Sequence, residues 1–282
     1  MIKNPVLMKE LRDRVRTWRS PFLITFYLGI LVIIGGFFLY ERTMYGYAGP
    51  RALRMGMEIF NLMAVLQLLL IGFLTPGMTA GVISGERERQ TLPLLMITRM
   101  SPLSVTVGKL LSAISYILLL VVLSLPLYSI VFFFGNISMR EFLQAAGIYL
   151  VTTLTLGSIG IFFSSFFRRT TVAVVFSYGI TFFLFAGTFF VAQMIRQIQQ
   201  YASYAQGPVD VPFIIYFNPL VALGSGLPMG QNFLPFPGGM FPIKALAPWQ
   251  VNLLLDAVII IVAVGLATWL IHPLRAGTRK KG

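Results

Sequence analysis

The chain has 282 residues, of which 57% are hydrophobic and only 11% are charged. Soluble domains carry roughly 25% charged residues, so this composition excludes a water-soluble globule and indicates an integral membrane protein. The formal net charge is +13, but the basic residues form short clusters beside apolar stretches, which is typical of membrane orientation signals and excludes a nucleic-acid interface.

Residues 1–20 are predicted to form an amphipathic helix that lies in the membrane surface. Asn4-Pro5 is a capping residue followed by a proline, the usual start of a helix. Apolar residues then recur on one side of the helix and basic residues on the other, as anionic lipid requires. The residues expected at the membrane surface are Lys9, Arg12, Arg16, Trp18 and Arg19. An unstructured basic tail is the alternative, because Arg14 falls on the apolar side.

Six stretches are apolar and long enough to cross the hydrocarbon core, which takes about 20 helical residues. They cover residues 22–40, 59–83, 103–134, 142–167, 171–195 and 249–271. The third contains Pro126, so we expect it to be tilted, kinked or extended beyond the membrane. The sequence therefore predicts an all-α polytopic membrane protein, with residues 1–282 forming a single transmembrane domain of six helices.

Both termini are predicted to lie in the cytoplasm. With the N-terminus inside, 16 of the 22 Lys and Arg residues fall on the cytoplasmic side, as the positive-inside rule requires. An even number of spans returns the C-terminus to that side. The six basic residues left on the other side are Arg42, Arg51, Arg54, Arg140, Arg196 and Lys244.

The loop at residues 85–102, between the second and third spans, combines a charged turn with an apolar one. The charged residues Glu86 to Arg89 come first, and an apolar run follows: Leu92, Leu94, Leu95, Met96 and Ile97. Pro93 suits the first turn of a short helix, with Thr91 as its cap. Such a helix cannot span the membrane, so its apolar side must be buried in headgroups or in another protein. Ser101-Pro102 is expected to cap and open the third span.

Residues 196–248 form the only long segment predicted on the extracytosolic side. The segment holds eight of the 16 prolines and few charges. Its apolar stretch at residues 213–227 fits a re-entrant or interfacial arrangement as well as an ordinary loop packed on the spans, and the sequence does not choose between them.

Few polar residues within the spans suggest a transport pathway. Asp256 lies about 10 Å into the last span, where an ionisable residue marks either a pathway or a local pair. Ser177, Thr181 and Thr188 share one side of the fifth span, a pattern that suits helix packing or contact with a solute. The absence of cysteine and the single histidine, His272, exclude disulfides and thiolate or multi-histidine metal sites.

Two stretches resemble the permease subunits of type-2 ABC transporters, a class dominated by exporters. The first is Asn4-Pro-Val-Leu-Met-Lys-Glu-Leu-Arg-Asp-Arg-Val-Arg, and the second is Gly85-Glu-Arg-Glu-Arg-Gln-Thr-Leu-Pro-Leu-Leu with its continuation through Ser101-Pro102 to Gly108-Lys-Leu-Leu. Because that family also has six spans, the resemblance covers essentially the whole chain. This sequence departs from the family pattern at Gln90, where Gly is usual, and at Pro93, where Glu is common.

The resemblance implies a cytoplasmic coupling helix at residues 85–102 that docks on a separate ATPase subunit. The apolar run Leu92 to Ile97 would form the contact, flanked by Glu86, Glu88 and Arg89. Gly108-Lys109 is followed by leucine and lacks the earlier glycine of a phosphate-binding loop. We therefore expect this chain not to be an enzyme and to bind no cofactor, with ATP and Mg in the partner.

The resemblance also implies a second permease copy, identical or different, and a location in a bacterial plasma membrane. In this family two copies meet largely through the second and fifth spans. The expected function is export of an amphipathic or hydrophobic solute. An ion-coupled secondary transporter is an alternative, for which Asp256 would be the coupling acid. A non-transporting membrane sensor or scaffold is the other.

Overall fold

The computed structural model describes residues 19–44, 50–91, 101–134, 137–202, 211–227 and 246–271, and all regular structure in these residues is helical. The elements are α2 (Arg19–Met44), α3 (Pro50–Thr79), α4 (Ser84–Glu88), α6 (Pro102–Leu123), α7 (Leu125–Phe134), α8 (Met139–Phe166), α9 (Thr170–Phe182), the π-helical turn η1 (Phe183–Gly187), α10 (Thr188–Ala202), the 3₁₀ turn η2 (Phe213–Phe217), α11 (Pro219–Gly226) and α12 (Pro248–Ile271).

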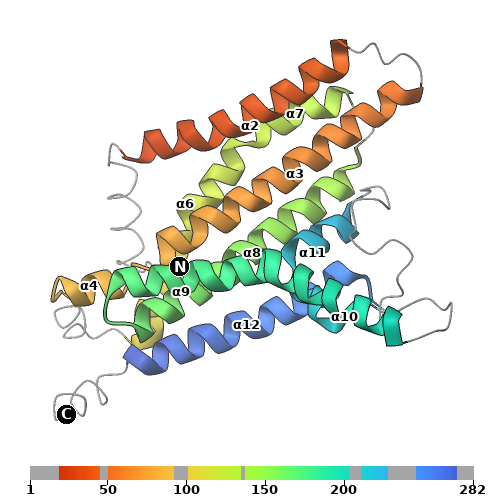
Figure 1. The fold of residues 1–282 in the computed structure, drawn as a ribbon. Coiled ribbons are helices and arrows are strands. Elements are labelled where there is room, and N and C mark those ends of the chain that lie inside the picture. The colour runs from red at the N-terminus through yellow and green to blue at the C-terminus, as the bar shows by residue number, and fades with distance from the viewer. Residues whose placement is uncertain are drawn as a thin grey trace.

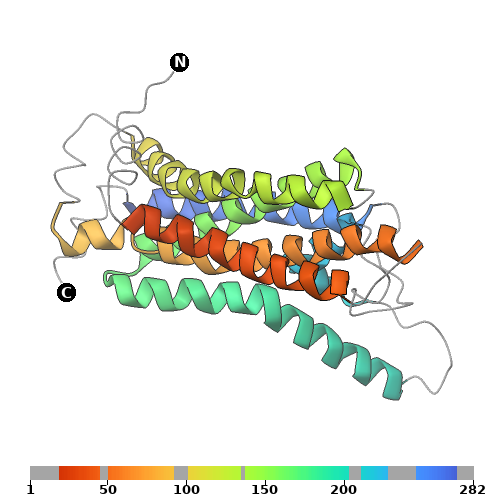
Figure 2. The ribbon, with the colours of Figure 1, turned by 90° about the horizontal axis from the view of Figure 1, so that it is seen from above.

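Six stretches of helix are long and apolar enough to cross a membrane, which confirms the prediction of an all-α protein with six spans. Figures 1 and 2 show these spans running roughly along one direction, so the bundle has two ends. The α4 end carries α4, the start of α6, the α8–α9 junction and the end of α12 (Figure 1). The opposite end carries α11 and the start of α12, and is called the α11 end.

Helix α8 is the most buried span and packs on α12, α3, α9 and α6. Its small residues allow neighbouring helices to come close, as is common within membranes. At Gly160 a Cβ atom would overlap the Thr79 Oγ1 and lie 2.9 Å from the Thr79 Cβ, so only glycine fits where α8 meets the end of α3. Helix α2, by contrast, packs mainly on α3 and remains largely uncovered.

The second apolar stretch, Gly56–Glu88, contains the predicted residues 59–83, but its first helix, α3, ends at Thr79. Pro76 lies in the last turns of α3 and cannot donate a backbone hydrogen bond, which weakens the helix there. Nearby, the Tyr178 hydroxyl donates to the Phe73 carbonyl at 2.9 Å. A turn over residues 80–83 then leads into α4.

The third span is divided at Ser124 into α6 and α7, two residues before Pro126, where the sequence left a tilted, kinked or extended span open. Ser124 lies at the division and joins it to α3, since its hydroxyl contacts the Val121 carbonyl at 2.7 Å and Gln67 Oε1 of α3 at 3.2 Å. At its start, Ser101 caps α6 by accepting from the Ser104 N–H at 3.2 Å, with Pro102 in the first turn, as predicted.

Residues 211–227 pack into the α11 end of the bundle. Leu223 is fully buried, and α11 contacts α12, α8 and α3. Asn218 caps α11 by accepting from the Leu220 N–H at 2.9 Å. The same side chain donates to the Phe185 carbonyl at 2.8 Å and to Thr188 Oγ1 at 2.9 Å. The stretch that the sequence left open is therefore fixed both to the spans and to the π turn η1.

Candidate functional site

Helix α4 leads directly into the loop that the sequence singles out between the second and third spans. It extends from the end of the bundle (Figure 1) and ends at Glu88, four residues before position 92. The predicted apolar docking residues Leu92, Leu94, Leu95, Met96 and Ile97 lie outside the described residues. The structure therefore describes the charged part of this loop, Ser84 to Thr91, which we call the α4 junction.

The start of α4 is fixed to α8 through Ser164. The Ser164 hydroxyl oxygen accepts from the backbone N–H groups of Ile83 at 2.8 Å and Ser84 at 2.9 Å. The Ser84 and Ser164 hydroxyls are also 3.3 Å apart, and both side chains are buried. Helix α4 has no side-chain cap of its own, so a serine from another span satisfies its first backbone donors.

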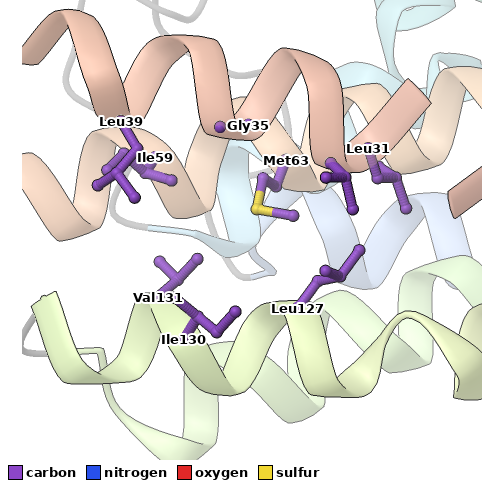
Figure 3. Close-up of a pocket in the computed structure, with 10 residues that line it drawn as sticks. Leu31, Gly35, Leu39, Ile59, Met63, Leu127, Ile130 and Val131 are labelled. Carbon is purple, nitrogen blue, oxygen red and sulfur yellow. The ribbon is translucent and has the colours of Figure 1, made fainter. Parts of the chain in front are cut away.

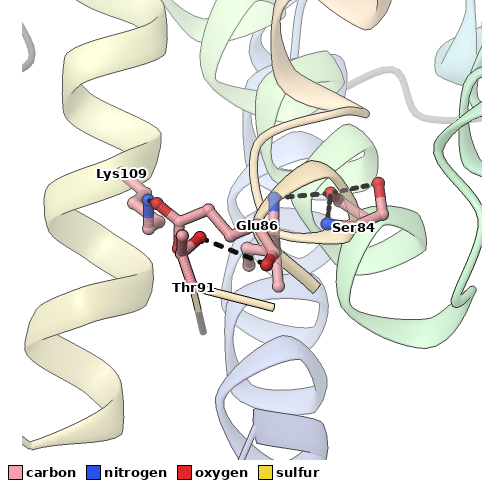
Figure 4. Close-up of polar contacts among 6 residues, drawn as sticks. Ser84, Glu86, Thr91 and Lys109 are labelled. Atoms are coloured by element: carbon pink, nitrogen blue, oxygen red, sulfur yellow. Dashed lines mark hydrogen bonds and ion pairs between the residues drawn. The ribbon is translucent and has the colours of Figure 1, made fainter. Parts of the chain in front are cut away.

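The middle of α4 is fixed to α6 by an ion pair. Figure 4 shows the side chains of Lys109 and Glu86 meeting between α6 and α4; Lys109 Nζ lies 2.5 Å from Glu86 Oε1. The Lys109 side chain is only 1% exposed, whereas Glu86 is 24% exposed. A buried ammonium group is unfavourable unless it is paired, so the position of Glu86 is tied to α6. Glu86 Oε2 is also buried and has no hydrogen-bond partner among the described residues.

The end of α4 is fixed to the start of α9 by Glu88. Glu88 Oε1 accepts from the Thr170 N–H at 2.8 Å, and Oε2 accepts from the Thr170 hydroxyl at 2.9 Å. Arg169, at the N-cap position of α9, provides no side-chain hydrogen bond. Glu88 therefore serves as a cap supplied by another helix, and its negative charge suits the positive end of the α9 dipole.

The last turn of α4 closes in a Schellman motif. The Thr91 N–H donates to the Glu86 carbonyl at 2.9 Å, and the Gln90 N–H to the Arg87 carbonyl at 3.2 Å. Gln90 has a φ of 58°, the left-handed conformation that this motif places at the residue after the C-cap. Glycine adopts this conformation without strain, which explains why glycine is usual there in the similar family. Thr91 was expected to cap the next helix, which lies outside the described residues, so that role stays a prediction.

The α4 junction is therefore connected to three spans within eight residues. It joins α8 at its start, α6 at its middle and α9 at its end. The structure brings the predicted residues Glu86 and Glu88 into these contacts, while the side chain of the predicted Arg89 is exposed. Among the described residues no group of three or more His, Asp or Glu residues could hold a metal ion. The arrangement joins one short helix to three separate spans.

Sequence reasoning missed the three residues on the other side of these contacts. In the sequence, Lys109 drew attention only as part of the Gly108-Lys-Leu-Leu stretch, without a predicted partner, and Ser164 and Thr170 drew none. Lys109 carried a usable signal, because a lysine seven residues into an apolar span requires a partner. Ser164 and Thr170 carried none, since buried serines and threonines are frequent in membrane helices.

The predicted pathway residues fall into two separate groups. Ser177, Thr181 and Thr188 are buried, and each hydroxyl donates to a carbonyl of its own helix at 2.7–2.9 Å. The π turn η1 separates Thr181 from Thr188. Asp256 is also buried, but its carboxyl lies beside the Thr155 hydroxyl of α8. No hydrogen bond within the described part of the chain joins Asp256 to the other three.

The predicted membrane-surface residues Lys9, Arg12, Arg16 and Trp18 lie outside the described residues, and Arg19 is the first residue of α2. The amphipathic helix over residues 1–20 therefore stays a prediction.

Comparison with protein-family models gives a match over most of the chain. The family model described as "ABC-2 family transporter protein" matches residues 5–272, which leaves out only the first four and the last ten residues. No curated protein matches the chain.

Proposed function

The chain belongs to the ABC-2 family of transporter proteins and is a multi-pass permease subunit. We propose that a separate ATPase subunit docks on residues 92–97 and drives export of an amphipathic or hydrophobic solute. ATP and Mg are bound by that partner, and a second permease copy, identical or different, completes the transporter.

The observation that carries this proposal is the threefold attachment of the α4 junction. Residues 92–97 directly follow the α4 junction, so a force applied to them acts first on that junction. From there it reaches α9 through Glu88, α6 through Lys109 and α8 through Ser164. The contacts of Glu88 and Lys109 are charge-assisted and therefore directional and strong, and Ser164 adds two neutral hydrogen bonds, so the proposal has the three spans move with α4. Such movement of packed helices is how permeases change between inward- and outward-facing states.

The proposed orientation places the α4 end in the cytoplasm of a bacterium, with the protein in the plasma membrane. Arg87, Arg89, Arg168 and Arg169 all belong to the α4 junction or to the turn that connects α8 with α9. A concentration of arginines in short loops marks the cytoplasmic side. Only on that side would residues 92–97 meet an ATPase.

The hydroxyl stripe of the fifth span supports a solute path where two copies meet. Ser177 and Thr181 donate their hydroxyl protons within the helix, but each oxygen retains capacity to accept a hydrogen bond. Because these side chains are buried within the chain, the proposal requires the surrounding spans to separate before a solute can reach them. In this proposal Asp256 is held locally beside α8 and is not part of the solute path.

Co-expression with candidate ATPase subunits tests the docking. We expect a stable complex with the unaltered chain and loss of that complex with Leu95→Asp. Leu246→Asp is the matched control, because Leu246 is an exposed leucine just before α12, at the α11 end, and its replacement should leave the complex intact. Absence of any complex, or equal complex formation by both variants, would contradict the proposal.

Flux measurements in vesicles separate the alternatives. A complex without ATP-dependent flux of any solute would favour a sensor or scaffold. Flux that persists without ATP and disappears in Asp256→Asn would favour an ion-coupled secondary transporter. The proposal requires flux that depends on ATP and falls in Glu88→Ala while the complex still forms.

A further inference from the structure

An apolar pocket of about 130 Å³ lies between α2, α3 and α7, away from the α4 junction. Figure 3 shows side chains of the three helices pointing into a common space. Its floor is buried and includes Leu31, Ile59, Met63 and Val131, each at most 4% exposed. The side chains that line it are hydrocarbon, apart from the thioether of Met63.

The pocket opens sideways, out of the bundle. Its rim includes Val32, which is 50% exposed, and Ile130, which is 49% exposed. Both residues belong to stretches of helix that are apolar enough to span the membrane. Exposed apolar side chains at this depth face lipid, so the mouth of the pocket faces the hydrocarbon core of the bilayer.

Two successive glycines of α2 form one wall. A Cβ at Gly35 would lie 3.4 Å from the Met63 Sδ, whereas a Cβ at Gly36 would meet nothing within 4 Å. The space beside Gly36 is therefore open. Helix α2 packs mainly on α3 and less on α6, which leaves room between α2 and α7.

We propose that this pocket binds one acyl chain of a membrane phospholipid, which fills the space between α2 and α7. An apolar cavity of about 150 Å³ accepts benzene, so the pocket is large enough for a short segment of hydrocarbon chain. Left empty, the floor residues would lose van der Waals contacts on one side. The lining offers no side-chain donor or acceptor to select a polar ligand, and the surrounding solvent consists of acyl chains. The proposal does not depend on the ATPase or on transport.

Photolabelling of the reconstituted protein tests the proposal. The probe is phosphatidylcholine with a diazirine at the middle of one acyl chain, mixed at a few per cent into phosphatidylcholine vesicles, with adducts mapped by mass spectrometry. We expect several-fold more adducts on residues 31–39 than on the exposed face of α12 at Val258 and Ile261, which are 59% and 72% exposed. Equal labelling of both faces would overturn the proposal.

Gly36→Leu should fill the pocket and reduce the labelling of α2 several-fold. Gly29→Leu is the matched control, because Gly29 lies two turns away on α2 and its Cβ would also meet nothing within 4 Å; it should retain the labelling. If Gly36→Leu does not fold, the smaller Gly36→Ala should give an intermediate loss. Labelling that is unchanged by substitution at Gly36 would overturn the proposal.

Two further outcomes would also overturn it. Labelling that appears only with the phosphatidylglycerol form of the probe would mean that a headgroup, and not the acyl chain, determines binding. Efficient cross-linking of Val32→Cys between two copies, with no lipid adducts on α2, would mean that a second copy covers the pocket. Equal labelling by both lipids and no such cross-link is the result that the proposal predicts. Since no ATPase is present, failure here leaves the proposed function unaffected.

Discussion

The α4 junction and the α2–α7 pocket are built from opposite kinds of contact. At the junction, a five-residue helix is joined to three spans by an ion pair and by serine and threonine hydroxyls. At the pocket, α2 faces α7 across a space lined by apolar side chains and two glycines. Hydrogen bonds to charged groups fix both distance and direction, whereas apolar contacts fix neither.

The difference matters because water is absent from most of the bundle. Apolar contacts between spans gain little over contacts with lipid, so polar contacts and close packing determine which helices move together. The structure concentrates such contacts at the α4 junction and at the α3–α8 crossing. Helix α2 has fewer of them and can exchange its contacts with lipid. Four substitutions test this contrast, from the largest expected effect to the smallest.

Glu86→Gln should have the largest effect, since it leaves the buried ammonium group of Lys109 without its carboxylate partner. Removal of one member of a buried ion pair destabilises a protein by about 3–5 kcal/mol. Because Glu86 is partly exposed, we expect Glu86→Gln to destabilise the protein by ~3 kcal/mol or less. The free energy of unfolding in detergent and ATP-dependent flux should both fall.

The double variant Glu86→Gln/Lys109→Met is the control for that experiment. It removes both charges, and apolar replacement of a whole ion pair is often neutral. Its stability should therefore exceed that of Glu86→Gln. If the two variants unfold at the same temperature, the pair does not hold α4 to α6.

Gly160→Ala should rank second, at about 2 kcal/mol, because overpacking a tight contact forces the backbones apart. The new Cβ would overlap the Thr79 Oγ1 and lie 3.3 Å from the Ala80 backbone nitrogen. Gly147→Ala on the same helix is the control, since its Cβ would meet nothing within 4 Å. Thermal unfolding gives the melting temperatures of both variants. Equal melting temperatures would show that α8 and α3 tolerate the extra methyl group at Gly160.

The sequence was sufficient to predict the six spans, because a chain in lipid must cross it in long apolar helices. The sequence also indicated Glu86 and Glu88 as site residues, because they lie beside an apolar turn. It did not reveal what these residues bind. The partners are distant along the chain, at 23 residues for Lys109 and 82 for Thr170, and no local pattern reports a contact that depends on how spans pack.

The end of α3 shows a second limit. Apolarity continues to Ile83, so composition alone extends the second span to that residue. The helix ends earlier because Pro76 disturbs it and because Ser164, from another span, accepts the backbone N–H of Ile83. That alternative partner exists only once α8 is in place.

Glu88→Ala should have a smaller effect than the first two substitutions, because Glu88 is exposed and exposed ion contacts contribute little. The substitution removes both hydrogen bonds to Thr170 and the cap of α9. Thr170→Val, which keeps the backbone N–H and loses only the hydroxyl bond, should lower the melting temperature less. The difference in melting temperature between the Glu88→Ala variant and the unaltered protein should become smaller at high salt. If salt does not change this difference, the cap is not electrostatic.

Gln90→Gly should have the smallest effect and the opposite sign. Gln90 occupies the left-handed region, with φ at 58°, which is unfavourable for a residue with a Cβ by roughly 1–2 kcal/mol. Glycine removes this strain but increases the freedom of the unfolded chain, so the net gain in unfolding free energy should be below ~1 kcal/mol. Arg89→Gly is the matched control: Arg89 has a φ of −80°, where glycine brings only the entropic loss and should destabilise. If both substitutions lower the melting temperature, the Schellman turn does not hold Gln90 under strain. The last turn of the α4 junction is then less rigid than its hydrogen bonds indicate.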